Sequence, residues 1–337
     1  GTVNLGTGKI TVNGNTTLKN VNCDAFLAGE TKLTAPAAPA AGSEIKIALP
    51  LSRLQKTDGS VIITNTGRDI DENDSRFVYE VPLIKILRSE DDLLVKLPVH
   101  EHDGIIYTPV DDLSNIPAGG GNYYLIRDNP MAKELTIASD KTVNVCLNGH
   151  KNSRTKITNS GTLNITDCKY GTKDEGYISG NTGYNNNYPI DNAAKSTLNM
   201  KNVSVKESEG NPVIRGQAKA SITIENCNFE NNTAKSLYIS GAETTVTNCT
   251  FKNNGGNVAG GAVIFAERNT NYSMLTIKDC VFEGNHTTSG NSSGGAINYE
   301  SWGGLLLDGC TFTGNSATGV NAKGGALYTK GKELTIK

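Results

Sequence analysis

The chain has 337 residues, and its 32 basic and 34 acidic side chains give a formal charge of −2 at pH 7. This balance provides no cationic surface for nucleic acid or an anionic membrane, so we expect no nucleic-acid partner. The sequence has no run of about 18 apolar residues, and therefore no membrane-spanning helix is predicted. Glycine contributes 37 residues and aromatic residues only 6%, a composition that favours a turn-rich all-β protein.

Residues 1–125 are predicted to form a smaller β-rich module or cap. Residues 1–34 alternate in polarity as strands do, and residues 34–43 are an alanine–proline linker or long exposed loop. Between residues 44 and 125, apolar runs separated by turn residues recur about every 10–15 residues, which suits a small antiparallel sheet or sandwich. A cap is expected here because an open solenoid end exposes backbone groups and core.

One repeated phrase dominates residues 222–328. The phrase is Cys-x-Phe-x-x-Asn, and it begins at Cys227, Cys249, Cys280 and Cys310, in steps of 22, 31 and 30 residues. The last three copies are each followed by Gly-Gly-Ala and an aliphatic residue. Self-similarity at such periods indicates stacked structural units. Two short strands around the cysteine and a third after Gly-Gly-Ala predict one coil of a parallel β-helix, spanning residues 126–337.

Stacked coils place like residues on like residues, so the repeat predicts interior ladders. The asparagines of the phrase (Asn232, Asn254, Asn285 and Asn315) are interpreted as an amide ladder that caps strand ends. The chain has seven cysteines, of which Cys168 and the four repeat cysteines share one sequence phase. We interpret this column as small buried side chains with free thiols rather than as disulfides.

A resemblance to known proteins begins in residues 119–151. Tyr123-Tyr124-Leu125, Leu135-Thr136-Ile137, the Cys146–His150 segment CLNGH and the Thr162–Cys168 segment TLNITDC follow one another in order. They resemble the opening coil of right-handed parallel β-helix surface proteins of gut-type Gram-positive bacteria. The F-x-x-N and G-G-A-[ILV] motifs are also similar to those of chlamydial-type polymorphic outer-membrane proteins, which are adhesins. The resemblance covers about residues 120–337 and implies a right-handed, single-stranded parallel β-helix.

The excess length of some coils predicts loops, and aromatic residues lie in or beside them. The longest excess is in residues 169–197. Exposed aromatic rings next to amide groups suit sugar binding, because a pyranose presents C–H groups to the ring and hydroxyls to the amides. The predicted binding residues are Tyr177, Tyr184, Tyr188, Tyr272, Tyr299 and Trp302.

Carboxylates and histidines offer weaker candidates for chemistry. Asp279 and Asp308 lie on adjacent predicted coils, so their carboxylates would approach about 5 Å, the separation found in retaining glycosidases. Aspartate is also a favoured corner residue, and for this reason no catalytic residue is assigned. His100 and His102 point to one face of a strand but lack a third ligand in the sequence. No metal or cofactor is therefore predicted.

The resemblance and the motifs together lead to two functional hypotheses. The first is a secreted or cell-surface bacterial protein, adhesin-like or structural and monomeric, whose loops bind a glycan or a host surface protein. The second is a polysaccharide-active enzyme, a lyase or a glycoside hydrolase, because a fold does not determine function. A groove with two carboxylates on one strand face would favour the enzyme, and ladders of Asn, Thr and Gly would favour adhesion. Residues 334–337 repeat the strand opening at 275–278, so the helix is expected to continue beyond residue 337.

Overall fold

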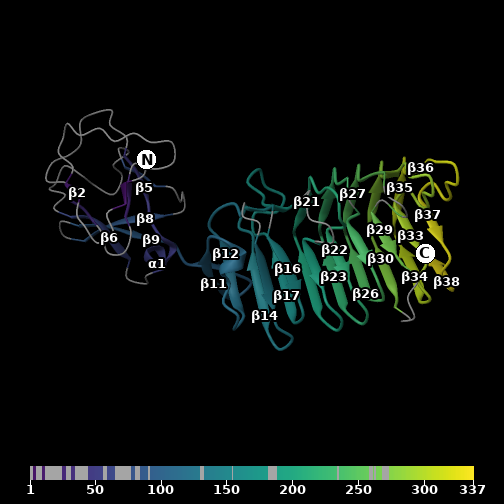
Figure 1. Cartoon of the computed structure of the whole chain (residues 1–337), viewed down its shortest axis with the longest axis horizontal. Helices are drawn as coiled ribbons and strands as arrows, with labels where there is room; N and C mark the ends of the chain where they lie inside the picture. The colour runs from purple at the N-terminus through teal and green to yellow at the C-terminus, as the bar shows by residue number, and fades with distance from the viewer. Residues whose placement is uncertain are drawn as a thin grey trace. The chain divides into compact units, whose positions relative to one another are not determined.

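The computed structural model describes residues 3–4, 10–11, 25–27, 32–34, 45–55, 59–64, 77–79, 84–89, 92–129, 133–153, 155–180, 188–233, 235–257, 261, 263–267 and 273–337. The chain forms two compact units, residues 1–109 and 110–337 (Figure 1). The division between Pro109 and Val110 precedes the predicted boundary at residue 125. Apart from Thr34, the predicted linker at 34–43 lies outside the described residues.

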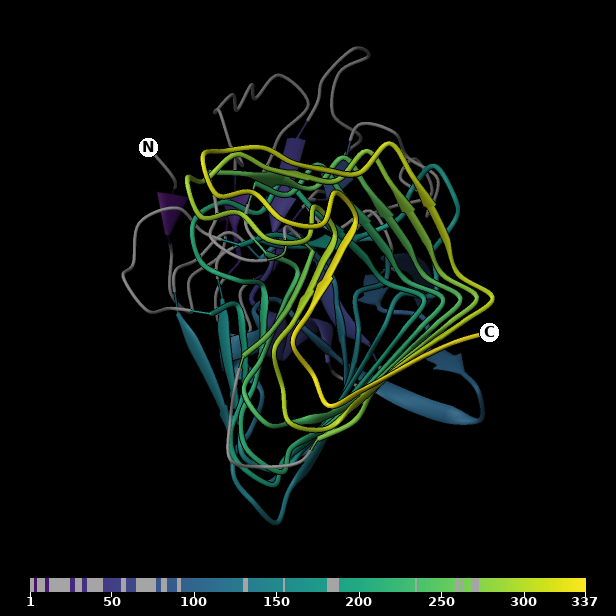
Figure 2. The same ribbon diagram turned by 90° about the vertical axis from the view of Figure 1, so that its right-hand side faces the viewer.

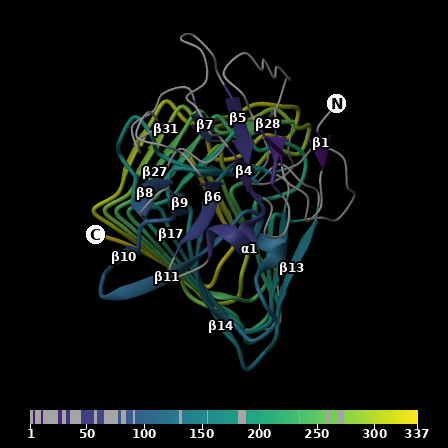
Figure 3. The same cartoon turned by 90° about the vertical axis from the view of Figure 1, so that its left-hand side faces the viewer.

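The first unit holds two small sheets that are partly parallel (Figure 3). One sheet contains, in order, β1 (Val3–Asn4), β3 (Ala25–Phe26), β5 (Ile45–Ala48) and β7 (Phe77–Tyr79). The other contains β2 (Ile10–Thr11), β4 (Leu33–Thr34), β6 (Ser60–Thr64), β9 (Asp92–Lys96) and β8 (Lys85–Ser89). Within residues 44–125, where an antiparallel sheet was predicted, β6 and β8 each pair antiparallel with β9, as predicted, whereas β5 pairs with β7 in parallel. The stretches between β1, β3 and β5 exceed the dozen or so residues that a parallel crossover needs.

Two further elements complete the first unit. The short helix α1 (Leu51–Leu54) buries Arg53, whose guanidinium donates to the Leu27 carbonyl oxygen at 3.2 Å. The hairpin of β10 (His100–His102) and β11 (Ile105–Val110) carries the two histidines. His102 stacks on Tyr107 with 4.3 Å between ring centroids, and His100 meets the same ring edge-on at 5.7 Å. The histidines thus belong to an aromatic cluster of the hairpin.

The second unit is a stack of coils built from three long parallel sheets and one short one. Sheet 1 contains, from its first coil onward, β12 (Gly121–Leu125), β14 (Thr142–Cys146), β17 (Thr162–Thr166), β20 (Thr197–Lys201), β23 (Ser221–Glu225), β26 (Glu243–Thr247), β30 (Leu275–Lys278), β34 (Gly304–Asp308) and β38 (Glu333–Ile336). Sheet 2 contains β15 (Lys151–Asn152), β18 (Tyr177–Ile178), β21 (Ser204–Lys206), β24 (Asn228–Glu230), β27 (Thr250–Lys252), β31 (Val281–Glu283) and β35 (Thr311–Thr313).

Sheet 3 follows sheet 2 along each coil. It contains β13 (Glu134–Ile137), β16 (Lys156–Asn159), β19 (Ile190–Asn192), β22 (Ile214–Gly216), β25 (Leu237–Ile239), β29 (Ile264–Ala266), β33 (Ile297–Tyr299) and β37 (Leu327–Thr329). The short sheet contains β28 (Gly255–Gly256), β32 (His286–Thr287) and β36 (Ser316–Ala317), and the 3₁₀ turn η1 (Leu113–Asn115) precedes β12. Seen along the stack, successive coils superimpose (Figure 2). No helix in the described part of the chain has the length and apolar character that crossing a bilayer requires.

The interior columns of the last coils confirm the predicted register. Phe229, Phe251, Phe282 and Phe312 stack with successive centroid distances of 4.8, 4.8 and 4.7 Å. Cys227, Cys249 and Cys280 are buried in a neighbouring column, where the backbone N–H of Cys227 points to Sγ of Cys249 at 3.4 Å. Asparagine tolerates the left-handed conformation, and it occupies the corner before the cysteine at Asn226 (φ 52°) and Asn248 (φ 54°).

The corner at Asp167 departs from this pattern and corrects one prediction. Cys168 is exposed, whereas Asp167 is 1% exposed and takes the interior position. Its carboxylate accepts hydrogen bonds from the backbone N–H groups of Gly149 (2.8 Å), Lys169 (3.1 Å) and Gly176 (2.7 Å). These bonds turn the chain before Cys168 can reach the interior. The six described cysteines are free thiols, as predicted, and Cys23 lies outside the described residues.

Asp167 makes stability depend on pH in a direction that can be measured. Burial raises the pKa of this carboxyl in spite of the three N–H groups that lower it. A raised folded pKa means that the stabilising contribution of Asp167 is complete below its unfolded pKa of about 3.9 and is lost as pH rises through the folded pKa. We therefore expect the free energy of unfolding of the wild type, minus that of Asp167→Asn, to fall from pH 3 towards pH 7. Denaturant titrations at each pH measure this difference, and a rise would contradict the assignment.

Candidate functional site

The outer surface of sheet 3 brings together aromatic and charged side chains from successive coils. Ile190 and Asn192 face the interior, and strand alternation therefore directs the Asp191 side chain to the outer face, where it is also buried, with 8% of it exposed. The register continues this outward row from Asp191 to Arg215 and Tyr238. A second outward row holds Ser240, Glu267 and Glu300. We call this surface the sheet-3 face, defined by Tyr188, Asp191, Arg215, Tyr238, Ser240, Glu267, Glu300, Trp302, Tyr328, Lys330 and Lys332.

At one end of the sheet-3 face, an ion pair supports two aromatic rings. The Arg215 guanidinium donates to both oxygens of Asp191, at 2.8 and 2.7 Å. Its central carbon lies 4.4 Å from the ring centroid of Tyr188, which stacks at 6.2 Å on Tyr238. Burial opposes the charge of Arg215, but the bonds to Asp191 raise its pKa overall. Because Asp191 and Arg215 neutralise each other's charge, the aromatic rings are the main groups at this end that can contact a ligand.

In the middle of the face, two glutamates occupy equivalent positions on neighbouring coils. The Tyr238 hydroxyl and the Ser240 hydroxyl each donate to one carboxylate oxygen of Glu267. Burial, followed by the bond to Glu267, raises the pKa of Tyr238 above its usual range, so this phenol stays a donor at neutral pH. The backbone N–H of Glu300 donates to the Ala266 carbonyl oxygen at 2.8 Å, which places Glu300 in the row of Glu267. Two carboxylates thus share one strand face.

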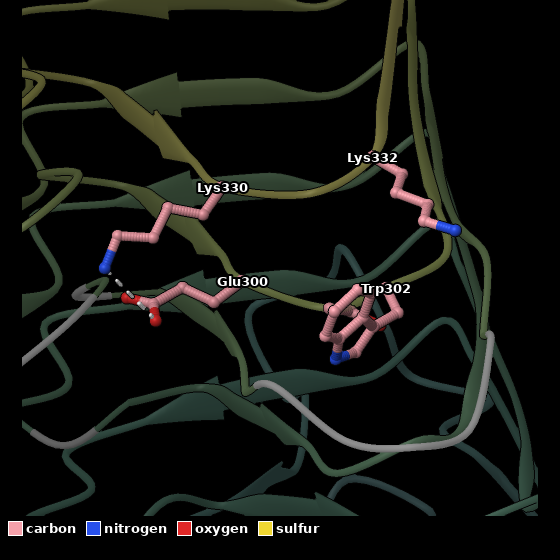
Figure 4. A pocket seen from close by; sticks show the side chains of 5 residues that line it. Glu300, Trp302, Lys330 and Lys332 are labelled. Carbon is pink, nitrogen blue, oxygen red and sulfur yellow. Dashed lines mark ion pairs between the residues drawn. The ribbon is translucent and has the colours of Figure 1, made fainter.

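At the other end of the face, Trp302 lies in a pocket of about 270 Å³. The pocket is lined by Glu300, Ser301, Trp302, Lys330 and Lys332. The Glu300 carboxylate lies 3.8 Å from Nζ of Lys330, and Nζ of Lys332 is 5.8 Å from the indole centroid. In Figure 4 the indole lies between the Glu300–Lys330 pair and Lys332. The pocket therefore combines an apolar ring with both signs of charge.

The structure places the predicted binding residues on different surfaces. Tyr188 and Trp302 belong to the sheet-3 face. Tyr177 is half-buried on sheet 2, where its hydroxyl donates to Glu207 at 2.9 Å and Nζ of Lys151 lies 4.9 Å from its ring centroid. Tyr184 and Tyr272 lie outside the described residues.

Tyr299 is a correction, since the sequence predicted an exposed ring. The side chain is 1% exposed, and its hydroxyl lies within hydrogen-bonding distance of two carbonyl oxygens, those of Ser273 (3.1 Å) and Gly304 (2.9 Å). Tyr299 is the last residue of β33, and alternation along this strand turns it into the interior. The ring of Tyr299 is therefore not accessible to a ligand.

Asp279 and Asp308 do not form the carboxylate pair that their positions had indicated. The register pairs Asp308 with Lys278, one residue before Asp279. Asp279 is itself an exposed corner residue with φ of 52°, equivalent to Asn226 and Asn248 in the coils before it. A shift of one residue directs strand side chains to opposite faces, so the two carboxylates do not share a row. Asp279 is therefore interpreted as a corner residue rather than as a catalytic carboxylate.

Five residues of the sheet-3 face were not predicted from the sequence: Asp191, Arg215, Tyr238, Glu267 and Glu300. Alignment of the Gly-Gly-Ala motifs would not have paired the two glutamates, because Glu300 lies four residues after the alanine of its motif and Glu267 lies five residues after it. The strand register, in which Ala266 pairs with Tyr299, is what makes their positions equivalent. The coils of Asp191 and Arg215 lack Gly-Gly-Ala, and only the strand register brings these two residues together.

Comparison with known proteins supports the architecture. Residues 196–336 match the model of a family described as a right-handed β-helix region. No curated protein and no solved structure matches the chain. The family match and the parallel register together confirm the predicted right-handed parallel β-helix.

Proposed function

We propose that this chain is an adhesin-like interaction protein whose sheet-3 face binds glycans. The observation that carries the proposal is that Tyr188, Tyr238 and Trp302 lie, together with carboxylates, on or directly beside the strands of sheet 3. Aromatic rings receive the C–H face of a pyranose, and carboxylates accept hydrogen bonds from its hydroxyls. A bacterial extracellular or cell-surface location, a monomeric state and a host surface as partner belong to the same proposal, and the family resemblance motivates them.

The outer surface of sheet 1 also supports an interaction protein rather than an enzyme. The side-chain amides of Asn122, Asn144, Asn164 and Asn199 form a ladder with bonds of 2.5, 2.6 and 2.7 Å. The register continues this row with threonines at positions 223, 245 and 276. Ladders of Asn and Thr without catalytic groups are the arrangement that we expect of an adhesive scaffold.

Binding to a glycan array tests the proposal. The wild type is expected to bind at least one class of glycan, and Trp302→Ala is expected to weaken this binding about tenfold, because an aromatic contact contributes up to about 1.5 kcal/mol. Tyr177→Ala is the matched control, since Tyr177 is a half-buried aromatic residue on sheet 2 and should leave the affinity unchanged. A wild type that binds no glycan would contradict the proposal, and a loss confined to Tyr177→Ala would move the site to sheet 2.

A polysaccharide-active enzyme, lyase or glycoside hydrolase, is the second candidate function. It is favoured by the equivalent positions of Glu267 and Glu300 on adjacent parallel strands, which lie about 4.8 Å apart. Retaining glycosidases hold their two carboxyl groups about 5–5.5 Å apart. Release of reducing sugar by the wild type, abolished in both Glu267→Gln and Glu300→Gln while glycan binding persists, would replace the adhesin proposal with this one.

A further inference from the structure

Resting on the proposed glycan binding, we propose that the Trp302 pocket recognises a sugar unit that carries one anionic group, a carboxylate or a sulfate. The pocket volume of about 270 Å³ is close to the lower limit, about 300 Å³, of typical small-ligand sites. A pocket of this size suits one ring of a glycan chain, while neighbouring rings extend along the sheet-3 face.

A sugar that packs against Trp302 would meet two kinds of charged group. Nζ of Lys332 lies over the indole ring, 5.8 Å from its centroid, within reach of a charged substituent on the sugar. The Glu300 carboxylate, which lies 3.8 Å from Nζ of Lys330, also lines the pocket and can accept hydrogen bonds (Figure 4). An ammonium is a compact point charge that attracts a carboxylate or a sulfate, and the carboxylate of Glu300 suits ring hydroxyls.

The charge of the pocket also favours an anion. Two ammonium groups and one carboxylate line it, although the whole chain has a net charge of −2. Selectivity for an anionic sugar is therefore assigned to this pocket, with Lys332, whose ammonium lies over the indole of Trp302, as the group that meets the anion.

Trp302 is the only tryptophan of the chain, so its fluorescence reports directly on the pocket. The wild type is titrated with four probes in two matched pairs: oligogalacturonate and its methyl ester, and a sulfated oligosaccharide and its desulfated form. At least one anionic probe is expected to bind about tenfold or more tightly than its neutral partner, with a preference that weakens as salt rises. The pair that shows the preference identifies the carboxylate or the sulfate as the anion.

Two charge-removing variants separate this inference from nonspecific attraction. Lys332→Gln is expected to abolish the preference by lowering the affinity for the anionic probe to that for its neutral partner. Lys252→Gln is the matched control and should retain the preference. Lys252 is also a surface lysine, but it lies on sheet 2, where its Nζ is 3.1 Å from a carboxylate oxygen of Glu283. Equal affinity for charged and neutral probes, or a preference that survives in Lys332→Gln, would overturn the inference while leaving the proposed function intact. If no probe and no glycan on the array binds, both fail.

Discussion

Replacement of Phe251 by alanine is expected to lower the free energy of unfolding by about 3–5 kcal/mol, the range for truncation of a buried phenylalanine. Phe251 is fully buried between Phe229 and Phe282, with a centroid distance of 4.8 Å on each side. Its loss removes apolar contacts to both neighbouring coils. The ladder of parallel strands sets the coil spacing, and the cavity therefore cannot close by collapse of the stack.

Two variants serve as controls for Phe251→Ala in a urea titration, one on the same strand and one on an equivalent strand. Thr250→Ala changes the preceding, outward-facing residue of β27 and should alter stability by no more than about 0.5 kcal/mol. Phe312→Ala should cost less than Phe251→Ala, because Phe312 is only partly buried and stacks on Phe282 alone among the described phenylalanines. Equal costs for Phe251 and Phe312 would show that stacking between coils is not the source of the stability.

The regular repeat explains why the architecture of residues 222–328 was predictable from the sequence. Each inward residue sits above its equivalent in the next coil, so one correct alignment of the cysteines also places the phenylalanines and asparagines. The prediction was wrong at Cys168, where the same sequence phase is present. There the three hydrogen bonds to the Asp167 carboxylate decide the conformation, and all three donors belong to residues outside the Thr162–Cys168 segment that carries the repeat pattern.

The candidate site was less predictable because it depends on which outward residues become neighbours. Asp191 and Arg215 are separated by a full coil and form a pair only through the register of β19 and β22. Tyr299 was predicted to be exposed because it lies near a loop in the sequence. It is the last residue of β33, however, and strand alternation directs its ring inward. Aromatic residues near loops are thus a useful first signal, but burial decides which of them can contact a ligand. Register then decides which charges accompany them.

Replacement of Asn254 by leucine is expected to cost about 3–5 kcal/mol, although the two side chains have similar volumes. Asn254 is fully buried, and its Oδ1 accepts from the backbone N–H (3.1 Å) and from the side-chain amide (2.8 Å) of Asn232. Its Nδ2 donates to the Phe229 carbonyl oxygen at 2.9 Å and to Oδ1 of Asn285 at 3.0 Å. Leucine fills the space but leaves several of these buried groups without a partner, each at a cost of about 1–3 kcal/mol.

Asn254→Asp distinguishes loss of hydrogen bonds from loss of packing. Burial raises the pKa of a carboxyl, and the protonated acid retains one acceptor and supplies one O–H donor in place of the amide N–H. This variant should therefore be least destabilised below pH 4 and should lose stability as pH rises through its folded pKa. The cost of Asn254→Leu relative to the wild type has no such titration and should change little over the same range. Denaturant titrations of both variants from pH 3 to pH 7 measure the difference. A leucine variant as stable as the wild type would show that the amide ladder contributes nothing to the coil stack.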